Sequence, residues 1–447
     1  MSDTTLQIGA GAGYSGDRID PAVELSEYGD LDYLVFECLA ERTIALAQLD
    51  RLENPDAGYN SLLEERLRAV VENCLSNEIT IVSNMGAANV EGAVRKAAEI
   101  VQETEYDAQI AGVSGSDVLD AFGQFQSETF GGESIHEYEN EAVSADAYLG
   151  ADGIVKALEN GADIVLTGRV ADPSLFLAPM LYEFGWQVEP LTNSELIGQG
   201  IVAAHLLECA GQVTGGYFAD PGYKDVAGLD QLGFPIGEVS ESGEVTITKL
   251  PNTGGVIDTR TCTEQLLYEV HDPSEYITPD AVADFSHVKF TEVEQDRVEV
   301  TRADAEVHPE TLKVSVGYID SHLGEGQISY AGPGATKRAE LAEEIVRKRL
   351  EDIPWDELHV DHIGRDSLHG DRGRNHDQEP YEVRLRVAAK CPTQSAAKRV
   401  AREVQTLYTN GPAGGGGATM KTQKIVGIVS TLIDRTHVEP QLLEVQA

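Results

Sequence analysis

Arg169 and Asp172 stand three residues apart, directly after the apolar run Ile164–Leu166. A guanidinium binds carboxylates and phosphates through parallel hydrogen bonds, and a nearby carboxylate either orients it or accepts a proton. An apolar run that ends in a short polar loop is typical of a buried parallel strand, and α/β proteins bind ligands outside the carboxyl ends of such strands. We therefore expect Arg169 to hold an anionic group and Asp172 to move a proton. The alternative is an ion pair that only pins the loop.

Four other short apolar runs lead into loops that contain glycine, asparagine or aspartate. We interpret them as further buried strands whose ends line one edge of a sheet, which is where a site would form. The runs and their loops are Leu6–Ile8 with 9–17, Ile79–Val82 with 84–89, Ile110–Val113 with 114–117, and Val213 with 215–220.

The glycine-rich loop after the first run includes Gly11, Gly13 and Gly16. Glycine lets backbone amides approach a phosphate, but a proline follows soon after and no helix begins cleanly at the last glycine, so the loop fits a dinucleotide fingerprint poorly. We expect a cradle for an anion beside Arg18. In that cradle Asp17 is a second candidate for proton transfer and the backbone amides stabilise developing negative charge. The alternative is a structural turn with Asp17 and Arg18 as a surface pair.

Two further pairs of side chains suit substrate binding. Asn84 and Asn89 share one loop, where their amides would fix a ligand carbonyl or hydroxyl, or else satisfy the loop's own backbone. His205 and Glu208 lie at i, i+3 of an expected helix and therefore share a face. They would form an acid–base pair or two metal ligands, or else a solvated pair or a hydrogen-bonded core histidine.

The densest group of histidines and aspartates lies between residues 359 and 377. Such residues suit zinc or another metal bound through nitrogen and oxygen. Their spacing matches no metal motif, so we expect a solvated loop and predict no metal. The group comprises His359, Asp361, His362, Asp366, His369, Asp371, His376 and Asp377.

The elements that must position these residues change in character near residue 235. Before it, strand-like runs alternate with helical runs such as 63–74 and 90–101, which predicts an α/β fold with a mostly parallel sheet flanked by helices. From 235 to 335 apolar and polar residues alternate, which predicts a β-rich antiparallel subdomain. A helix at 336–351 completes a domain of residues 1–351. After a boundary at Pro354, strands near 357–363, 381–389 and 424–433 and a helix at 394–409 predict a small α+β domain over 355–447.

Composition narrows the class of protein further. The chain has 447 residues, with 33 basic against 76 acidic ones, a net charge of −43, and 41% hydrophobic residues. Acidic residues are spread along the chain, which argues against nucleic acid and anionic membranes as partners. Self-repulsion at this charge destabilises a compact state. We therefore expect adaptation to high salt, where charges are screened over ~3 Å at about 1 M.

Targeting and redox signals are weak in this sequence. No apolar stretch approaches the ~20 residues that span a bilayer, and the first residues lack the features of a secretory signal. The five cysteines are widely spaced and form no CxxC pair. This pattern predicts neither a disulfide framework nor a zinc knuckle. We expect a reduced, cytoplasmic protein.

Several of these segments together resemble a known family. The segments are 13–18, 31–34, 161–174, 205–209, 212–216, 263–268 and 329–334. From about residue 6 to 350 the chain resembles the acyclic terpene utilisation family AtuA, and Gly161–Ser174 is the most specific match. That family is associated with bacterial breakdown of citronellol and geraniol through coenzyme A thioesters. The resemblance implies a place in acyl-CoA or branched-chain catabolism but carries over no catalytic residue. Residues 355–447 resemble a ferredoxin-like appended domain.

We therefore expect an enzyme of acyl-CoA or branched-chain and terpenoid carboxylate catabolism, with chemistry of the hydratase or lyase type. Its substrate would be a small molecule or a coenzyme A thioester, with coenzyme A as part of the substrate and no resident cofactor. We also expect a homo-oligomer. The alternative is a non-catalytic subunit that binds acyl-CoA or acts as a scaffold in such a pathway.

Overall fold

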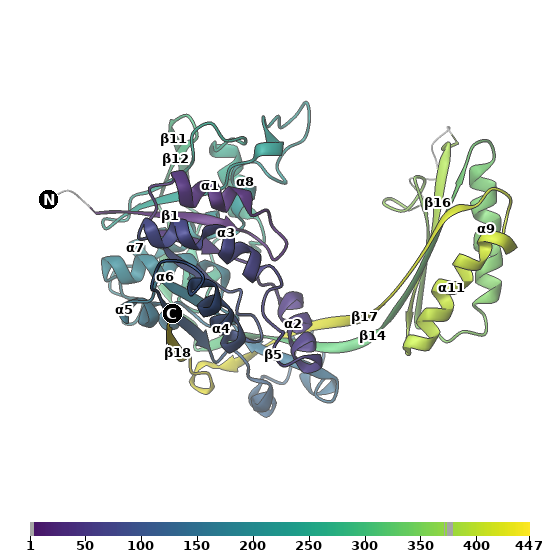
Figure 1. The fold of residues 1–447 in the computed structure, drawn as a ribbon, viewed down its shortest axis with the longest axis horizontal. Helices are drawn as coiled ribbons and strands as arrows, with labels where there is room; N and C mark the ends of the chain where they lie inside the picture. Colours follow the sequence, from purple (N-terminus) through teal and green to yellow (C-terminus); the bar gives the residue numbers. More distant parts are fainter. Residues whose placement is uncertain (1–3, 371, 373–378) are drawn as a thin grey trace. The chain divides into compact units, whose positions relative to one another are not determined.

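The computed structural model describes residues 4–370, 372 and 379–447. Contacts divide the chain into two compact units (Figure 1). Unit 1 comprises Met1–Gly317 and Ile428–Ala447, and unit 2 comprises Tyr318–Gly427. The division falls inside two long strands, β14 (Thr311–Ala331) and β17 (Gly416–Asp434). The sequence places the boundary at 351–355 instead, because composition does not change within a continuous strand.

Unit 1 is built on a ten-stranded mixed sheet. Its centre is parallel, in the order β1 (Thr5–Ala12), β2 (Tyr33–Phe36), β3 (Thr80–Ser83), β6 (Ile164–Thr167) and β4 (Gln109–Ser114). Beside β1, the antiparallel strands β7 (Pro235–Ser240), β8 (Val245–Lys249), β12 (Arg297–Thr301) and β11 (Lys289–Glu294) extend the sheet. At the other edge β18 (Gln441–Gln446) pairs with β4 antiparallel. The expected α/β class is confirmed at this level.

Four of the five apolar runs that precede polar loops are strands of this parallel centre. The prediction at Val213 is wrong, because that residue follows the short 3-10 helix η3 (Ala210–Gln212). The parallel strand that the sequence interpretation omitted is β2, which has four residues, all buried. That run is as long as β3 and β6, but it leads into Glu37-Cys38-Leu39-Ala40 and not into a loop with glycine, asparagine or aspartate, which is the signal that marks the other strands.

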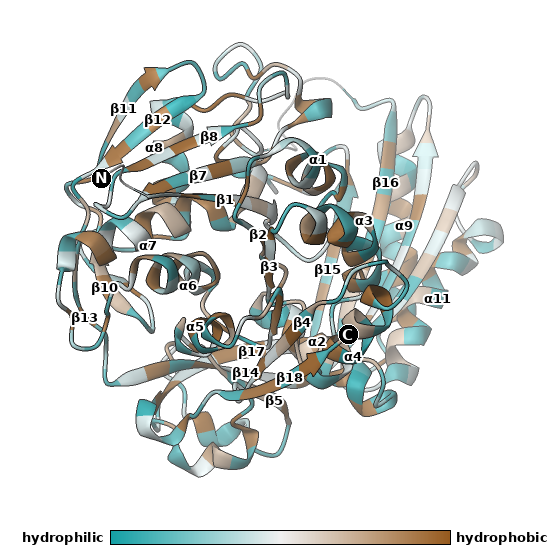
Figure 2. Ribbon diagram, turned by 60° about the vertical axis from the view of Figure 1, so that its left-hand side comes forward, coloured by the Kyte–Doolittle hydropathy of each residue, from teal (hydrophilic) through white to brown (hydrophobic). Residues whose placement is uncertain are grey.

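Helices cover both faces of the parallel centre (Figure 2). On one face lie α1 (Asp20–Tyr28), α3 (Leu63–Ser76) and α4 (Val90–Val101). On the other lie α5 (Asp152–Glu159), α6 (Asp172–Phe184) and α7 (Ser194–Glu208). Two more helices are α2 (Glu41–Glu53) and α8 (Thr259–Leu267), and the short 3-10 helices are η1 (Leu119–Gln124), η2 (Ile135–Glu137), η4 (Leu229–Gln231) and η5 (Arg435–His437).

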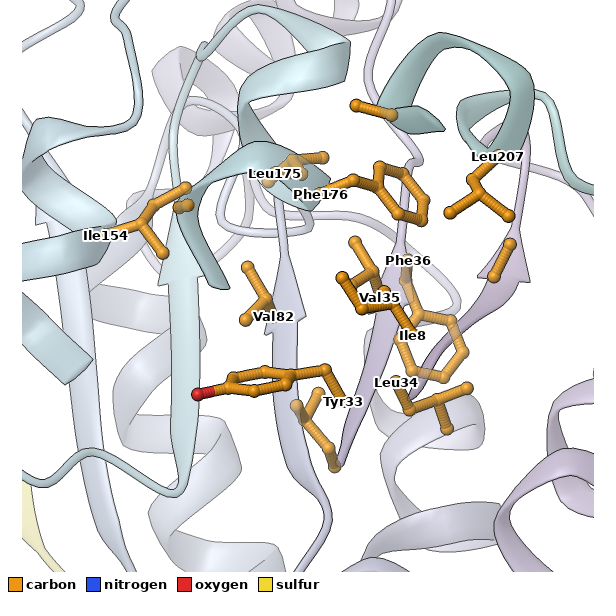
Figure 3. Close-up of a cluster of buried hydrophobic side chains, with 14 of the residues drawn as sticks. Ile8, Tyr33, Leu34, Val35, Phe36, Val82, Ile154, Leu175, Phe176 and Leu207 are labelled. Atoms are coloured by element: carbon orange, nitrogen blue, oxygen red, sulfur yellow. The ribbon is translucent and has the colours of Figure 1, made fainter. Parts of the chain in front are cut away.

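The core of unit 1 lies between the sheet and these helices. Figure 3 shows Ile8, Val35 and Val82 on neighbouring strands together with Phe176 of α6 and Leu207 of α7, and all five are fully buried. Burying one such side chain contributes about 1.5–3 kcal/mol. The packing fixes where the strands end, and therefore where the loops that follow them lie.

The 235–335 region supplies antiparallel strands, but in the described residues they do not form one body. Four of them, β7, β8, β12 and β11, join the main sheet. Three others, β9 (Tyr276–Ile277), β10 (Ala281–Asp284) and β13 (Asp304–Val307), form a separate sheet. The start of β14 pairs with β5 (Ala142–Ala147).

Unit 2 follows the order strand, helix, two strands, helix, strand. Its elements are the end of β14, α9 (Ala335–Arg349), β15 (Glu357–Ile363), β16 (Glu382–Cys391), α11 (Gln394–Asn410) and the start of β17. The sheet order is β15, β16, β14, β17. Both helices pack on β16 around a separate apolar core. Across the described parts of the two units, no helix combines the length and apolar character needed to cross a membrane.

Candidate active site

The carboxyl ends of the parallel strands are tied to one another by short hydrogen bonds. The backbone N–H of Glu37, just past β2, donates to the Ala12 carbonyl at the end of β1 (3.1 Å). Asn84, just past β3, accepts from the Cys38 N–H (2.7 Å) and donates to Glu37 Oε1 (3.0 Å). Asn84 is fully buried. These bonds place Glu37 in a fixed position at the edge where α/β proteins form their sites.

Arg169 lies at the end of β6 and is 2% exposed. Its Nη1 is 3.0 Å from Asp172 Oδ1 and also donates to the Leu39 carbonyl. The guanidinium carbon lies 4.1 Å from the centroid of the Tyr148 ring. A buried cation is costly unless it is paired, and here a carboxylate, a carbonyl and an aromatic face compensate it. The side chain of Asp172 is 32% exposed, although its Oδ1 atom is buried.

A second cation, Lys313 of β14, also lies near the Tyr148 ring, with its Nζ 4.6 Å from the ring centroid. Lys313 Nζ and the Tyr148 hydroxyl both donate to Glu41 Oε1, the former at 3.0 Å. Burial raises the pKa of Glu41, but the Tyr148 hydrogen bond and the charges of Arg169 and Lys313 outweigh it and lower the pKa to about 2. Glu41 is therefore ionised at neutral pH.

Three other carboxyl groups at this edge have pKa values that are raised above their usual range. Burial and the charge of Asp172 raise the pKa of Glu37 to about 8, against the hydrogen bonds from Leu39 and Asn84. Burial raises the pKa of Glu208 to about 7, where the charge of Asp172 adds to it and His205 opposes it. Burial also raises the pKa of Asp172 itself, against the lowering effect of Arg169. Like charges in a poorly solvated site cannot all ionise, so the acid cluster (Glu37, Asp172 and Glu208) carries fewer than three negative charges at neutral pH, and Glu37 is the member that keeps its proton.

Glu208 reaches the cluster from the C-terminal end of α7. Its Oε1 is 2.8 Å from His205 Nδ1, and His205 Nε2 is 3.2 Å from the Leu266 carbonyl. The imidazole lies beside the Tyr276 and Phe285 rings, at centroid distances of 4.9 and 5.7 Å. The side chains of His205 and Glu208 are therefore in direct contact on one face of a buried helix end.

The glycine-rich loop after β1 is held by a buried arginine that sequence reasoning did not single out. Arg66 is fully buried and donates to the carbonyls of Ser15 (3.1 Å) and Asp17 (3.0 Å). The Asp17 carboxylate accepts from the backbone N–H groups of Gly13 and Arg18, both at 2.9 Å. Both carboxylate oxygens of Asp17 thus shape its own loop, and the Gly13 amide is already bonded.

The glycines of this loop allow close packing next to the acid cluster. A Cβ at Gly13 would lie 2.4 Å from the carbonyl carbon of Cys209, and one at Gly11 would lie 2.6 Å from the Phe36 ring. A Cβ at Gly16 would meet only the side chain of its neighbour Tyr14, at 3.1 Å. Gly13 therefore brings the loop against the end of α7, directly after Glu208.

Besides Asp17, two more of the sequence-predicted residues serve local structure. Arg18 pairs with Asp20, and the Arg18 side chain is 39% exposed. Asn89 caps α4: its Oδ1 accepts from Gly92 N–H (3.0 Å) and its Nδ2 donates to the Ala57 carbonyl (2.7 Å). The structure brings the other predicted side chains of this set, Asn84, Arg169, Asp172, His205 and Glu208, to one edge of the sheet.

Sequence reasoning missed Glu37, Glu41, Tyr148 and Lys313. Glu37 directly follows β2, so recognising that strand would have given the signal. The others depend on contacts between distant segments, such as Lys313 with Glu41, and no local pattern marks them.

The described histidines and aspartates of the 359–377 group have separate partners. His359 lies 2.7 Å from Glu357, Asp361 pairs with Arg386 at 2.8 Å, and His362 lies 3.4 Å from Asp366. Asp371, His376 and Asp377 lie outside the described residues. Within 4–370, 372 and 379–447, no three His, Cys, Asp or Glu side chains are arranged to hold a metal ion.

A depression of about 570 Å³ lies against α8, lined by Thr259, Arg260, Thr263, Glu264, Leu267 and Tyr268. None of the three carboxyl groups of the acid cluster lines it. Burial raises the pKa of Tyr268, and the charges of Glu269 and Cys209 add to that effect.

Comparison with known proteins agrees with the resemblance seen in the sequence. The family model described as "Acyclic terpene utilisation family protein AtuA" matches residues 6–443, so the match continues through unit 2 and into β18. A search of curated proteins found no similar sequence. Because the family match spans nearly the whole sequence, the chain belongs to the acyclic terpene utilisation family AtuA.

Proposed function

We propose that this protein is an acid–base enzyme of acyl-CoA or branched-chain and terpenoid carboxylate catabolism, with chemistry of the hydratase or lyase type. The observation that carries the proposal is the acid cluster: three carboxyl groups at the sheet edge, two of them with pKa values near 7 and 8. General acid–base catalysis is most efficient when the pKa of the group lies near the working pH. Membership of the AtuA family supports the terpene-utilisation context.

Asp172 is the residue we assign to proton abstraction. Its side chain is partly exposed, and Arg169 at 3.0 Å favours its ionised form. Glu37 next to it is the protonated partner at neutral pH, because its pKa is raised to about 8. Environments that separate the protonation states of neighbouring carboxyl groups are how one site holds both an acid and a base.

Arg169 acts in this proposal as a positioning residue. Its guanidinium is enclosed by Asp172, the Leu39 carbonyl and the Tyr148 ring. We expect it to fix the Asp172 carboxylate and to keep it ionised. An anionic group of the substrate would contact Arg169 only after displacing one of these partners.

The scaffold alternative receives less support. A scaffold needs no group of buried carboxyls with raised pKa values, whereas such groups cluster at catalytic sites. We also propose that unit 2 is a ferredoxin-like domain. Its order of strand, helix, two strands, helix and strand is that of the ferredoxin-like motif.

Hydrogen exchange into substrate tests the proposal. The protein is incubated in D2O with 3-hydroxy-3-methylbutanoyl-CoA, 3-methyl-2-butenoyl-CoA and the two free acids, and deuterium incorporation is followed by mass spectrometry. We expect incorporation next to the carbonyl, reduced by about 10²–10⁴-fold in Asp172→Asn. The matched control is Asp20→Asn, an exposed aspartate that also pairs with an arginine. Exchange equal to that of buffer across the panel, or equal rates in wild type and Asp172→Asn, would contradict the proposal.

A further inference from the structure

His205 and Glu208 form a buried polar pair near the C-terminal end of α7. Glu208 is 7% exposed and His205 is 1% exposed. Glu208 Oε1 contacts the imidazole, but Glu208 Oε2 is buried and has no hydrogen-bond partner among the described residues. A buried oxygen left in this way costs about 1–3 kcal/mol. Such exceptions are uncommon in native proteins, and a catalytic role is one of their recognised explanations.

The contacts of the imidazole fix where its protons lie. Nε2 faces the Leu266 carbonyl at 3.2 Å, and a carbonyl oxygen can only accept, so Nε2 carries a hydrogen. Nδ1 faces Glu208 Oε1 at 2.8 Å. This short contact requires one further proton, located either on Nδ1 or on the carboxyl. The pair therefore stores one transferable proton and is neutral as a whole.

Asp172 is one of the charged groups that act on this pair. The charges of Asp172 and Glu269 both raise the pKa of Glu208, and the Tyr276 ring lies beside the imidazole. Cys209 follows Glu208 directly. Burial raises the pKa of Cys209, and the charges of Glu208 and Glu37 add to this effect. Asp172 comes from the start of α6 and Glu208 from the end of α7, two helices that pack against each other. The site thus has proton-transfer groups on two different elements.

We infer that Glu208, supported by His205, is a second catalytic acid opposite Asp172, so that the site adds or removes water across a carbon–carbon bond next to a carbonyl. This inference rests on the proposed function and narrows it to substrates with a hydroxyl on the β-carbon. A reaction that only moved one proton at the α-carbon would need Asp172 alone.

The step balances without an oxidant or a reductant. In the elimination direction the Asp172 carboxylate takes the proton from the α-carbon, and that electron pair becomes the carbon–carbon double bond. The bond between the β-carbon and the hydroxyl oxygen breaks, and Glu208 gives this oxygen a proton, so that water leaves. Asp172 ends protonated and the His205–Glu208 pair ends one proton short. Proton transfer from Asp172 to Glu208 restores both, and hydration is the reverse sequence.

The test separates the two proton transfers in one substrate. With 3-hydroxy-3-methylbutanoyl-CoA in D2O, α-deuterium incorporation and formation of the unsaturated thioester are measured in the same sample. We expect Glu208→Gln to keep incorporation within about threefold of wild type and to lose elimination by about 10²-fold or more. Asp172→Asn should lose both. The matched control is Glu103→Gln, an exposed glutamate paired with Arg68, which should change neither.

The inference is overturned if Glu208→Gln eliminates water at the wild-type rate, if it loses both readouts by the same factor, or if the wild type exchanges the α-hydrogen without eliminating water. Absence of exchange in the wild type overturns the proposed function instead. If Glu208→Gln fails to fold, 15N-histidine NMR of the wild type decides. We expect His205 with hydrogen on Nε2 and a titrating Nδ1, whereas hydrogen on Nδ1 with a bare Nε2 contradicts the stored proton.

Discussion

The two units of this chain differ in net charge. Residues 318–427, which form unit 2, contain 16 of the 76 acidic residues and 16 of the 33 basic ones. Unit 2 therefore has no net charge, and the remaining 60 acidic and 17 basic residues give unit 1 the whole excess of −43. The acidic excess that the sequence analysis describes as spread along the chain is confined to the unit that holds the candidate site.

The two units also differ in how their charged side chains are paired. On the unit 2 sheet, Arg386 of β16 bonds to Glu325 (2.7 Å) and to Asp361 (2.8 Å) on the two neighbouring strands. In unit 1 the charge of Asp172 raises the pKa values of both Glu37 and Glu208, and the buried Arg169 opposes the raised pKa values of Glu37 and Asp172. Opposite charges on neighbouring strands stabilise a sheet, whereas clustered like charges cost stability and are typical of functional sites. We therefore expect the paired charges of unit 2 to contribute to stability and the clustered carboxyl groups of unit 1 to contribute to catalysis.

The largest effect that we expect from this difference is a salt dependence restricted to unit 1. At low ionic strength the unscreened repulsion acts on unit 1, and it opposes a total stability of order 5–15 kcal/mol. Hydrogen–deuterium exchange of the full chain should show loss of protection in the ten-stranded sheet below about 0.1 M salt, while β14 to β16 of unit 2 stay protected. Full protection of both units in dilute buffer would contradict the salt adaptation that we propose.

The next largest effect that we expect is a loss of stability when the buried cation Arg169 is removed. Arg169→Ala leaves Asp172 without its partner at 3.0 Å. Removing one partner of a buried ion pair costs about 3–5 kcal/mol, so thermal unfolding at high salt should occur at clearly lower temperature. Arg18→Ala is the control, since Arg18 forms an exposed pair with Asp20 and should change stability by less than about 1 kcal/mol. If the two variants unfolded alike, the buried pair of Arg169 and Asp172 would not contribute to stability as we expect.

Glu37 and Glu41 should affect the pH dependence of the free energy of unfolding in opposite directions. The pKa of Glu37 is raised from 4.5 to about 8, so the folded state keeps its proton and the contribution of Glu37 to stability falls as pH rises from 4.5 to 8. Glu37→Gln should remove this loss, and its stability relative to wild type should rise by roughly 1–4 kcal/mol between pH 5 and 8.

Glu41 gives the matched case. Its pKa is lowered to about 2, so its stabilising contribution is present above pH 4.5 and is lost as pH falls toward 2. Glu41→Gln should therefore be less stable than wild type at pH 7, and the difference should shrink in acid. Its side chain is 34% exposed, so the effect is smaller than that of Glu37. Denaturant unfolding at several pH values measures both effects. The assigned pKa shifts would be refuted if the stability of both variants, relative to wild type, changed with pH in the same direction.

Much of the site could be predicted from the sequence because its positions follow strand ends. The apolar runs before Arg169 and Asn84 lead directly into loops that contain glycine, asparagine or aspartate, and His205 and Glu208 share a helix face by spacing alone. Glu37 was not found in this way, because β2 is as long as β3 and β6 but leads into Glu37-Cys38-Leu39-Ala40, which contains none of these loop residues. In so acidic a chain, one more glutamate after a short apolar run carries no signal.

The roles of loop residues were harder to predict than their positions. Asp17 and Asn89 have side chains that either bind a ligand or bond to nearby backbone N–H groups, and both choices produce the same sequence pattern. In the structure Asp17 bonds to the Gly13 and Arg18 amides, and Asn89 caps α4. The unit boundary was missed for a related reason: it lies within β14 and β17, where strand periodicity continues without a break.

The smallest effect that we expect lies on the sheet of unit 2. The Arg386 side chain is 32% exposed, and its partners Glu325 and Asp361 are 15% and 26% exposed. Water and salt weaken such pairs, which contribute about 0–1 kcal/mol. Arg386→Gln should therefore shift the unfolding of unit 2 only slightly, as followed by hydrogen exchange of β15 and β16, and should leave deuterium incorporation into substrate unchanged. A large loss of turnover in this variant would mean that the paired charges of unit 2 take part in the chemistry. It would contradict the proposed difference between stabilising charges in unit 2 and catalytic charges in unit 1.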